Sequence, residues 1–176
     1  MAEKVRVMYS EEEVTARIQE IADQINRDYE GKEVHLIGIL RGGSFFMCDL
    51  AKRISIPVTI DFMSASSYGM STTSSGVVKI VKDLEESIVG RNVIVVEDII
   101  DTGRTLSYLL EMLRERGPET LKLCTLLNKP DRRVVDVNID YNGYTIPDEF
   151  VVGYGLDYAQ RYRNLPYIGI VEFDEE

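Results

Sequence analysis

Hydrophobic positions in the first third of the chain follow two periods in turn. A capping box of Ser10 and Glu13 opens the first predicted helix, which should end near Gly31. Its apolar positions recur at helical spacing and would cover a sheet: Val14, Ile18, Ile21 and Ile25. The continuous apolar run from Val34 to Leu40 predicts a strand buried on both faces. A glycine turn and a second helix should follow, with apolar positions at Phe46, Leu50 and Ile54.

The pattern is interrupted once before the centre of the chain. Pro57 leads into an alternating segment that predicts another strand, with apolar positions at Val58, Ile60 and Phe62. Residues 64–76 are rich in Ser, Thr and Gly and have no usable periodicity, so we expect a long loop there. A loop this long inside a compact domain is more often functional than a simple linker. Strand character returns at Val77, Ile80 and Val81.

The central strand-turn-helix unit has the clearest pattern. The β-branched run 93–96 predicts a buried strand, and residues 120–127 predict the next. Between them a leucine stripe predicts a helix from Thr105 that stops at Gly117, with Leu106, Leu109, Leu110 and Leu113 on one face. Later segments are short and broken by Pro and Gly, which predicts a small irregular hood with a final strand near residues 167–171. Alternating strands and helices indicate an α/β fold: an open, twisted, mainly parallel sheet with helices on both faces. Ligands then belong at the strand ends.

Charge and cysteine content narrow the setting. Acidic residues outnumber basic ones by 30 to 20, giving a net charge of −10 that disfavours broad contact with nucleic acid. Cys48 and Cys124 both lie in apolar stretches and are interpreted as buried free thiols, which fits a reducing compartment. The N-terminal segment has no signal-peptide core, and no run approaches the roughly 20 apolar residues of a membrane span. We expect a soluble, cytoplasmic protein.

The turn after the central strand carries the most specific chemistry. Residues 101–105, Asp-Thr-Gly-Arg-Thr, offer backbone N–H groups, two hydroxyls and a glycine just ahead of a helix N-terminus, a combination suited to phosphate. Glu97 and Asp98 would repel phosphate and suit hydroxyl groups or a divalent cation instead. A ribose 5-phosphate activated as a pyrophosphate meets these demands together.

These residues also carry a resemblance to a known family. The segment EDIIDTGRT (residues 97–105) resembles the phosphoribosyl-pyrophosphate (PRPP) signature of the type I phosphoribosyltransferases. Four further segments narrow the resemblance to the hypoxanthine-guanine branch: LIGILRGG (36–43), SASSYG (64–69), LLNKPDRR (126–133) and IPDEFVVGYGLDYAQRYRNLPYIG (146–169). The resemblance implies one phosphoribosyltransferase domain over residues 1–176, with a hood built from the C-terminal segment and part of the N-terminus.

For PRPP, the resemblance implies that Glu97 and Asp98 hold the ribose hydroxyls while Mg2+ bridges sugar and pyrophosphate. An isolated Glu-Asp pair would otherwise be interpreted as solvated acids. Asp101 matches the acid beside purine N7, as general base or hydrogen-bond partner, although capping the next helix is an alternative role. The matching 5-phosphate loop consists of Thr102, Gly103, Arg104 and Thr105.

The pyrophosphate site is implied at a second strand end. Leu40, Arg41 and Gly42 match a loop that often has a cis peptide before its basic residue, which is commonly lysine in mammalian relatives. From sequence alone this could be a plain glycine turn. Arg163 matches a pyrophosphate contact, and Asp157, grouped with the purine-binding residues, matches a ligand, often through water, of a second Mg2+ on the pyrophosphate. Each of these two could equally be a surface charge.

The purine site is implied by residues that look ordinary in isolation. Lys129 would donate to the 6-oxo group of hypoxanthine or guanine and repel the 6-amino group of adenine. Phe150 would stack on the base, and Val151 would meet its edge through the backbone. Viewed alone, Phe150 would be assigned to the core and Lys129 to the surface. Ser67 and Tyr68 match a mobile lid loop, whereas a flexible linker is the alternative. The only histidine, His35, is interpreted as structural.

The function predicted is transfer of the 5-phosphoribosyl group from PRPP to N9 of a 6-oxopurine, giving IMP or GMP and pyrophosphate, in a homodimer or homotetramer. A PRPP-binding regulator of nucleotide synthesis is the main alternative. Such a regulator needs a basic face or a helix-turn-helix to bind nucleic acid, and neither pattern is visible here. An aspartyl-phosphate hydrolase is disfavoured because Asp98 and Asp101 do not have the D-x-D spacing.

Overall fold

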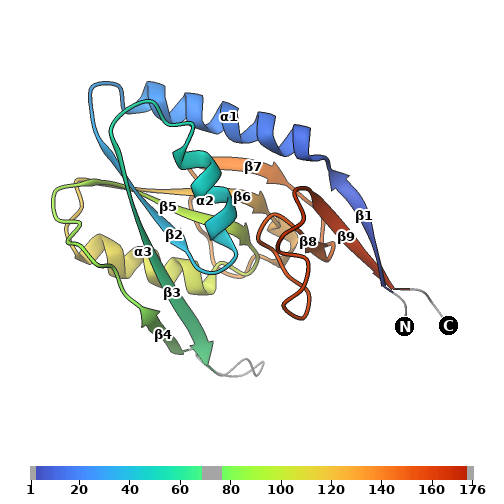
Figure 1. Ribbon diagram of the computed structural model, residues 1–176. Coiled ribbons are helices and arrows are strands. Elements are labelled where there is room, and N and C mark those ends of the chain that lie inside the picture. Colours follow the sequence, from blue (N-terminus) through green and yellow to red (C-terminus); the bar gives the residue numbers. More distant parts are fainter. Residues whose placement is uncertain (1–2, 69–76, 174–176) are drawn as a thin grey trace.

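A mainly parallel sheet forms the centre of the molecule in the computed structural model, which describes residues 3–68 and 77–173. Within those residues the larger sheet has six strands in the order β4-β3-β2-β5-β6-β7 (Figure 1). Their bounds are β2 Val34–Ile39, β3 Val58–Tyr68, β4 Val77–Lys82, β5 Asn92–Ile100, β6 Thr120–Asn128 and β7 Tyr141–Thr145. Only the β3–β4 pair is antiparallel. The open parallel sheet predicted from the sequence is confirmed.

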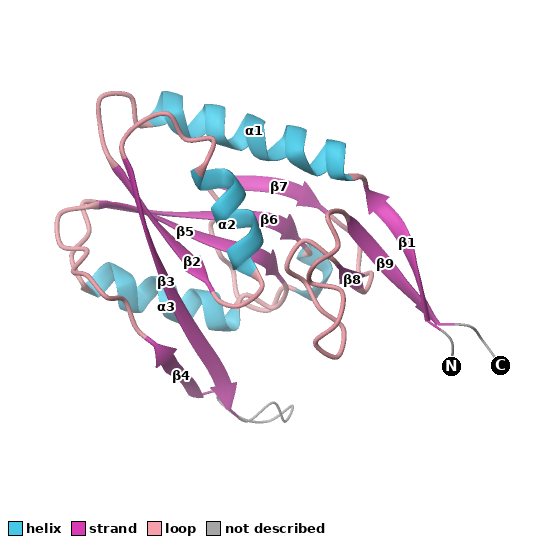
Figure 2. Ribbon diagram, viewed as in Figure 1, coloured by secondary structure: helices cyan, strands magenta, loops and turns pink. Residues whose placement is uncertain are grey.

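Helices cover both faces of this sheet, as predicted (Figure 2). The helices α1 (Glu11–Asp28) and α2 (Gly43–Ala51) lie on one face and α3 (Arg104–Glu115) on the other. The capping box is also confirmed, because the Glu13 N–H donates to Ser10 Oγ at 3.2 Å. A 3-10 turn, Pro130–Arg132, follows β6.

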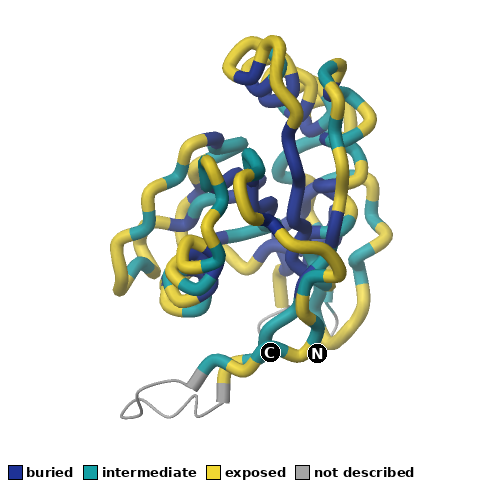
Figure 3. The backbone as a smooth tube through the Cα atoms, turned by 90° about the vertical axis from the view of Figure 1, so that its left-hand side faces the viewer, coloured by how far each residue is buried: buried dark blue, intermediate teal, exposed yellow. Residues whose placement is uncertain are grey.

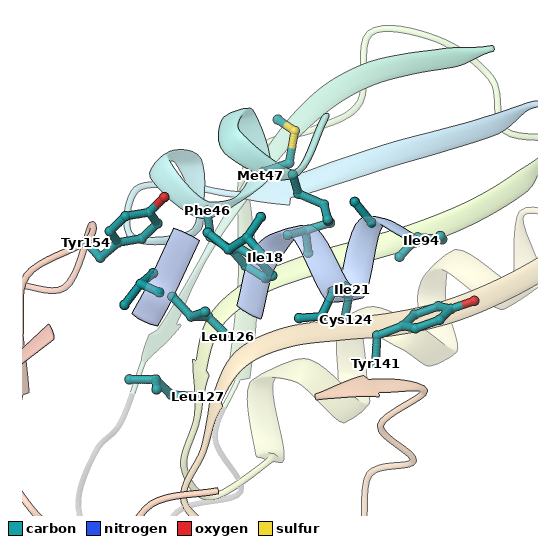
Figure 4. Close-up of a cluster of buried hydrophobic side chains, with 14 of the residues drawn as sticks. Ile18, Ile21, Phe46, Met47, Ile94, Cys124, Leu126, Leu127, Tyr141 and Tyr154 are labelled. Carbon is teal, nitrogen blue, oxygen red and sulfur yellow. The ribbon is translucent and has the colours of Figure 1, made fainter. Parts of the chain in front are cut away.

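The strands of the centre are buried on both sides because alternate residues pack against different helices. Ile94 and Val96 of β5 belong to the core under α1 and α2, whereas Val93 and Val95 belong to the core under α3. In Figure 4, Ile18 and Ile21 of α1 lie over Ile94 and the β6 residues. Figure 3 shows the buried central strands between more exposed outer segments. This two-sided core fixes the strand ends that carry the site.

The hood contains a second, three-stranded antiparallel sheet of order β1-β9-β8. Its strands are β1 Glu3–Tyr9, β8 Val151–Val152 and β9 Ile168–Phe173, so the first and the last strand lie side by side (Figure 1). The strands make the hood more regular than the sequence predicted. Between β8 and β9 the chain is irregular, with left-handed backbone at Tyr154, Ala159, Gln160 and Tyr162.

Three local predictions need correction. Residues 64–68 continue β3 and pair with β4 rather than starting a loop, because the antiparallel ladder satisfies their backbone without apolar side chains; residues 69–76 of the predicted loop lie outside the described residues. Ile54 lies beyond the end of α2 at Ala51. Cys124 is buried, but Cys48 is exposed, because it lies on the outer side of α2 while Phe46, Met47 and Leu50 face inward.

In the described segments, no helix is both long enough and apolar enough to cross a membrane.

Candidate active site

The predicted site residues gather at one edge of the large sheet. Strands β2, β5 and β6 are adjacent and parallel, so their carboxyl ends meet at the same edge. The segments that follow them are the turn 40–43, the turn 101–103 and the turn that begins at Lys129. The hood segment between β8 and β9 lies against the first of these turns. Four stretches distant in sequence therefore build one site.

Glu97 and Asp98 are adjacent, partly buried carboxylates near the end of β5. The Asp98 N–H donates to Glu97 Oε1 at 3.0 Å, and the Ile99 N–H donates to Asp98 Oδ1 at 2.7 Å. Burial raises the pKa of Glu97 well above its usual value, and the neighbouring Asp98 charge raises it further. Burial also raises the pKa of Asp98. Two acids in this state favour a ligand that brings positive charge or hydroxyl donors.

This pair fits Mg2+. The ion prefers oxygen ligands and commonly takes one or two carboxylates together with substrate phosphates and water. In residues 3–68 and 77–173, no group of three or more His, Cys, Asp or Glu side chains is placed to hold a metal ion. Asp157 has other partners: its Oδ1 lies 3.1 Å from Arg163 Nη2, and its Oδ2 accepts the Gln160 N–H at 3.0 Å.

The turn 40–43 packs directly against Asp98 and the hood. The Leu40–Arg41 peptide is cis. A Cβ at Gly42 would collide with the Asp98 carboxylate, and a Cβ at Gly155 would collide with the Gly42 carbonyl oxygen, so both positions need glycine. Arg163 Nη1 donates to the Gly155 carbonyl at 2.6 Å. The structure therefore brings the predicted pyrophosphate residues to the carboxylate pair.

The turn 101–103 leads into α3. Gly103 has φ of +81°, a left-handed conformation that suits glycine, and it precedes the first helical residue, Arg104. No side-chain capping hydrogen bond is present at Gly103, and the Asp101 carboxylate lies 3.6 Å from Lys129 Nζ. The Arg104 N–H lies 3.4 Å from Thr102 Oγ1. The positive end of the helix dipole thus faces the predicted phosphate loop.

Lys129, just after β6, lies between two acids. Its Nζ is 3.6 Å from Asp101 Oδ1 and 3.8 Å from Asp148 Oδ1, and its side chain is only 10% exposed. Arg132 Nε donates to both Asp148 oxygens at 2.9 Å, and this contact lowers the pKa of Asp148. The surface alternative for Lys129 is therefore wrong. Asp148 and Arg132 were not singled out from the sequence, because nothing local distinguishes them from surface charges.

The remaining predicted residues differ in position. Phe150 is 49% exposed, not core, and Tyr158 meets its ring edge-on with centroids 5.5 Å apart. Val151 is buried in β8. Ser67 is exposed and pairs with Val78 on β4; the Tyr68 side chain lies outside the described residues. Among the described contacts, none joins Ser67 to the strand-end cluster.

Two further residues are His35, near the start of β2 and away from the site, and Tyr154, in the hood. His35 is buried and its Nδ1 lies 2.7 Å from Thr59 Oγ1, which agrees with a structural role. In the hood, the Tyr154 hydroxyl donates to the Asp49 carboxylate of α2. Figure 4 shows the Tyr154 ring near Phe46, so this contact anchors the irregular segment over the turn 40–43. No sequence pattern marked the Tyr154–Asp49 pair.

Comparison with known proteins gives a consistent result. Residues 8–159 match the phosphoribosyl transferase domain family. A hypoxanthine phosphoribosyltransferase of Salmonella typhimurium is 53% identical over 178 residues, covering 99% of this chain and 100% of the relative. A bifunctional protein TilS/HprT of Listeria monocytogenes is 52% identical over 167 residues, covering 95% of this chain but only 26% of the relative's length.

Solved structures agree with these relatives. A crystal structure of a hypoxanthine-guanine phosphoribosyltransferase from Bacillus anthracis has a TM-score of 0.90 and 48% identity, covering 97% of this chain and 100% of that chain. The likeness therefore extends to nearly the whole fold as well as to the sequence motifs. The chain belongs to the phosphoribosyl transferase family, in its hypoxanthine-guanine phosphoribosyltransferase branch.

Proposed function

We propose that this protein transfers the 5-phosphoribosyl group of PRPP to N9 of hypoxanthine or guanine, forming IMP or GMP and pyrophosphate in purine salvage. One observation carries the proposal: a nearly buried ammonium, Lys129 Nζ, lies 3.6 Å from the Asp101 carboxylate, at the strand ends where Glu97 and Asp98 also lie. A donor beside an acceptor is the pair that the 6-oxo and N7–H groups of a purine require. The names of the closely similar relatives support the same reaction.

PRPP would be held mainly by strand-end carboxylates and loop backbone. Glu97 and Asp98 would bind the ribose hydroxyls and Mg2+, which when bound neutralises charge on the pyrophosphate. The backbone N–H groups and hydroxyls of residues 102–105 would bind the 5-phosphate at the N-terminus of α3. Pyrophosphate would meet the backbone of Leu40, Arg41 and Gly42 and the guanidinium of Arg163. The Asp157 carboxylate would help to hold a second Mg2+.

The base would be oriented by side chains. Lys129 would donate to the 6-oxo oxygen, Phe150 would stack on the ring, and the Val151 backbone would meet its edge. As N9 bonds to C1 and the C1–O bond to pyrophosphate breaks, the Asp101 carboxylate would accept the N7 proton. Holding both reactants in line supplies most of the acceleration in such a scheme, because the reaction becomes effectively unimolecular.

Three further proposals concern the surroundings of the site. Ser67 and Tyr68 would belong to a lid that closes and excludes water from the reacting carbon. The protein would act in the cytoplasm as one folded domain. It would also assemble as a homodimer or homotetramer, a state that light scattering at several concentrations measures.

The test is nucleotide formation from PRPP and Mg2+ with hypoxanthine, guanine, xanthine, adenine and uracil offered separately. We expect rapid product with hypoxanthine or guanine and little with adenine or uracil. Equal use of adenine would contradict the role of Lys129. Absence of product with every base, despite magnesium-dependent PRPP binding, would favour the regulatory alternative.

A further inference from the structure

A second arginine beside Lys129 reaches back to the predicted phosphate loop. Arg133 follows the 3-10 turn after β6, and its side chain points toward the end of β5. Its Nε donates to the Asp101 carbonyl at 3.0 Å, and its Nη2 lies 3.4 Å from the Ile100 carbonyl. The same Nη2 donates to Asn128 Oδ1. One guanidinium therefore bridges the two strand ends.

The backbone around Arg133 continues the same contact. The Lys129 N–H donates to the Ile100 carbonyl at 3.0 Å. The N–H groups of Val134 and Val135 donate to the Thr102 carbonyl at 2.9 and 3.1 Å. Residues 129–135 thus hold the carbonyl groups of three successive residues, Ile100, Asp101 and Thr102.

Holding these carbonyls also orients the N–H groups of the loop. A peptide unit is planar, so a carbonyl fixed at one side fixes the direction of the N–H of the next residue. The Ile100, Asp101 and Thr102 carbonyls therefore set the directions of the Asp101, Thr102 and Gly103 N–H groups. Close packing restricts the last of these further, since a Cβ at Gly103 would approach the Val135 carbonyl to 2.6 Å.

We propose that Arg133 is a positioning residue that sets the phosphate-binding geometry of the loop. The inference rests on the proposed function, because it takes residues 102–105 as the 5-phosphate site. Arginine suits the position because its rigid fork serves three acceptors on two strand ends. A lysine ammonium has no planar fork, so it would satisfy only part of this set.

The test compares Arg133→Met and Arg133→Lys with the wild-type chain in steady-state kinetics. We expect Arg133→Met to raise the KM for PRPP at least tenfold while the KM for hypoxanthine changes less than twofold. Arg133→Lys should lie between the wild type and Arg133→Met. The matched control is Arg116→Met, which removes another forked arginine, bound to Asp83 at 2.7 and 2.8 Å outside the site. Its two KM values should equal those of the wild type.

Two outcomes would overturn the inference: a PRPP KM in Arg133→Met within twofold of the wild type, or equal rises in both KM values with a lowered Tm, which would indicate general damage. The proposed function fails separately, if the wild type forms no nucleotide. In that case calorimetric binding of PRPP with Mg2+ decides the inference, and the Kd must still rise at least tenfold in Arg133→Met.

Discussion

The β5-turn-α3 unit and the hood contribute to the same site but are built differently. In the first, a buried strand ends in a short turn, and the single left-handed residue among 101–105 is Gly103. In the hood, four non-glycine residues adopt left-handed backbone: Tyr154, Ala159, Gln160 and Tyr162. The strand and the helix on either side of the turn follow local periodicity, whereas the hood is held by contacts distant in sequence, such as Tyr154 with Asp49 and Tyr162 with Glu3. In the proposed function, the regular strand-turn-helix unit would bind phosphate through its backbone, and the hood would place side chains around the base.

The largest effect should come from Asp101, in the turn of the β5-turn-α3 unit. Asp101→Asn keeps the size of the side chain but removes the carboxylate that would accept the N7 proton. We expect kcat to fall about 10²- to 10⁴-fold, the usual contribution of a general base, with little change in the Kd for PRPP. Rapid-quench kinetics and calorimetry measure the two quantities.

Asp136→Asn is the matched control, since Asp136 is an exposed acid outside the strand-end cluster. It should leave kcat unchanged. If Asp101→Asn lowered turnover and PRPP affinity equally, the proposed role of Asp101 as proton acceptor would be contradicted.

A smaller effect is expected for base selection. Lys129→Met removes the ammonium that would recognise the 6-oxo group, a charged hydrogen bond worth about 1.5–3 kcal/mol. The ratio of kcat/KM for hypoxanthine over adenine should therefore fall roughly 10- to 150-fold. Lys32→Met, at an exposed lysine before β2, should leave the ratio unaltered. An unchanged ratio in Lys129→Met would place base selection elsewhere.

Stacking in the hood should contribute less again. Phe150→Leu keeps an apolar side chain but loses the aromatic face, an interaction worth about 0.5–1.5 kcal/mol. We expect the KM for hypoxanthine to rise about twofold to tenfold, while the Kd for PRPP stays constant. Val7→Leu, on the exposed side of β1, serves as the control. If PRPP binding weakened as much as base binding, the hood and the β5-turn-α3 unit would not have the separate roles proposed for them.

The smallest effect concerns His35 of β2, which belongs neither to the hood nor to the β5-turn-α3 unit. Burial, and then the Arg91 charge, lower the pKa of His35 below its usual 6.5. As pH falls through 6.5, His35 takes up a proton in the unfolded chain but stays neutral in the folded protein. The free energy of unfolding therefore decreases toward acid pH and is unaffected by His35 above pH 6.5. His35→Gln should flatten the change in unfolding free energy between about pH 6.5 and 5.5, measured by urea titration. Parallel curves for the two proteins would contradict this, and their kcat/KM should be equal at pH 7.5.

The sequence predicted the central sheet because buried strands and helix stripes are local patterns. It did not predict β1 or β7, whose backbone is satisfied by pairing: β1 pairs with β9 at the opposite end of the chain. It mistook residues 64–68 for loop for the same reason. In the site, the positions of Glu97, Asp98 and Lys129 followed from strand ends. Arg133 and Asp148 contact residues that are distant in sequence, and the path of the segment after β6 brings them together. No residue spacing in the sequence predicts these contacts.

The most direct measurement is the product balance of one reaction. Purified protein is incubated with PRPP, hypoxanthine and Mg2+, and IMP and pyrophosphate are quantified together. We predict that they form in a 1:1 ratio and that neither forms when Mg2+ is removed with EDTA. Pyrophosphate released without IMP, or no reaction at all, would contradict the proposal that the β5-turn-α3 unit and the hood together transfer the phosphoribosyl group to the base.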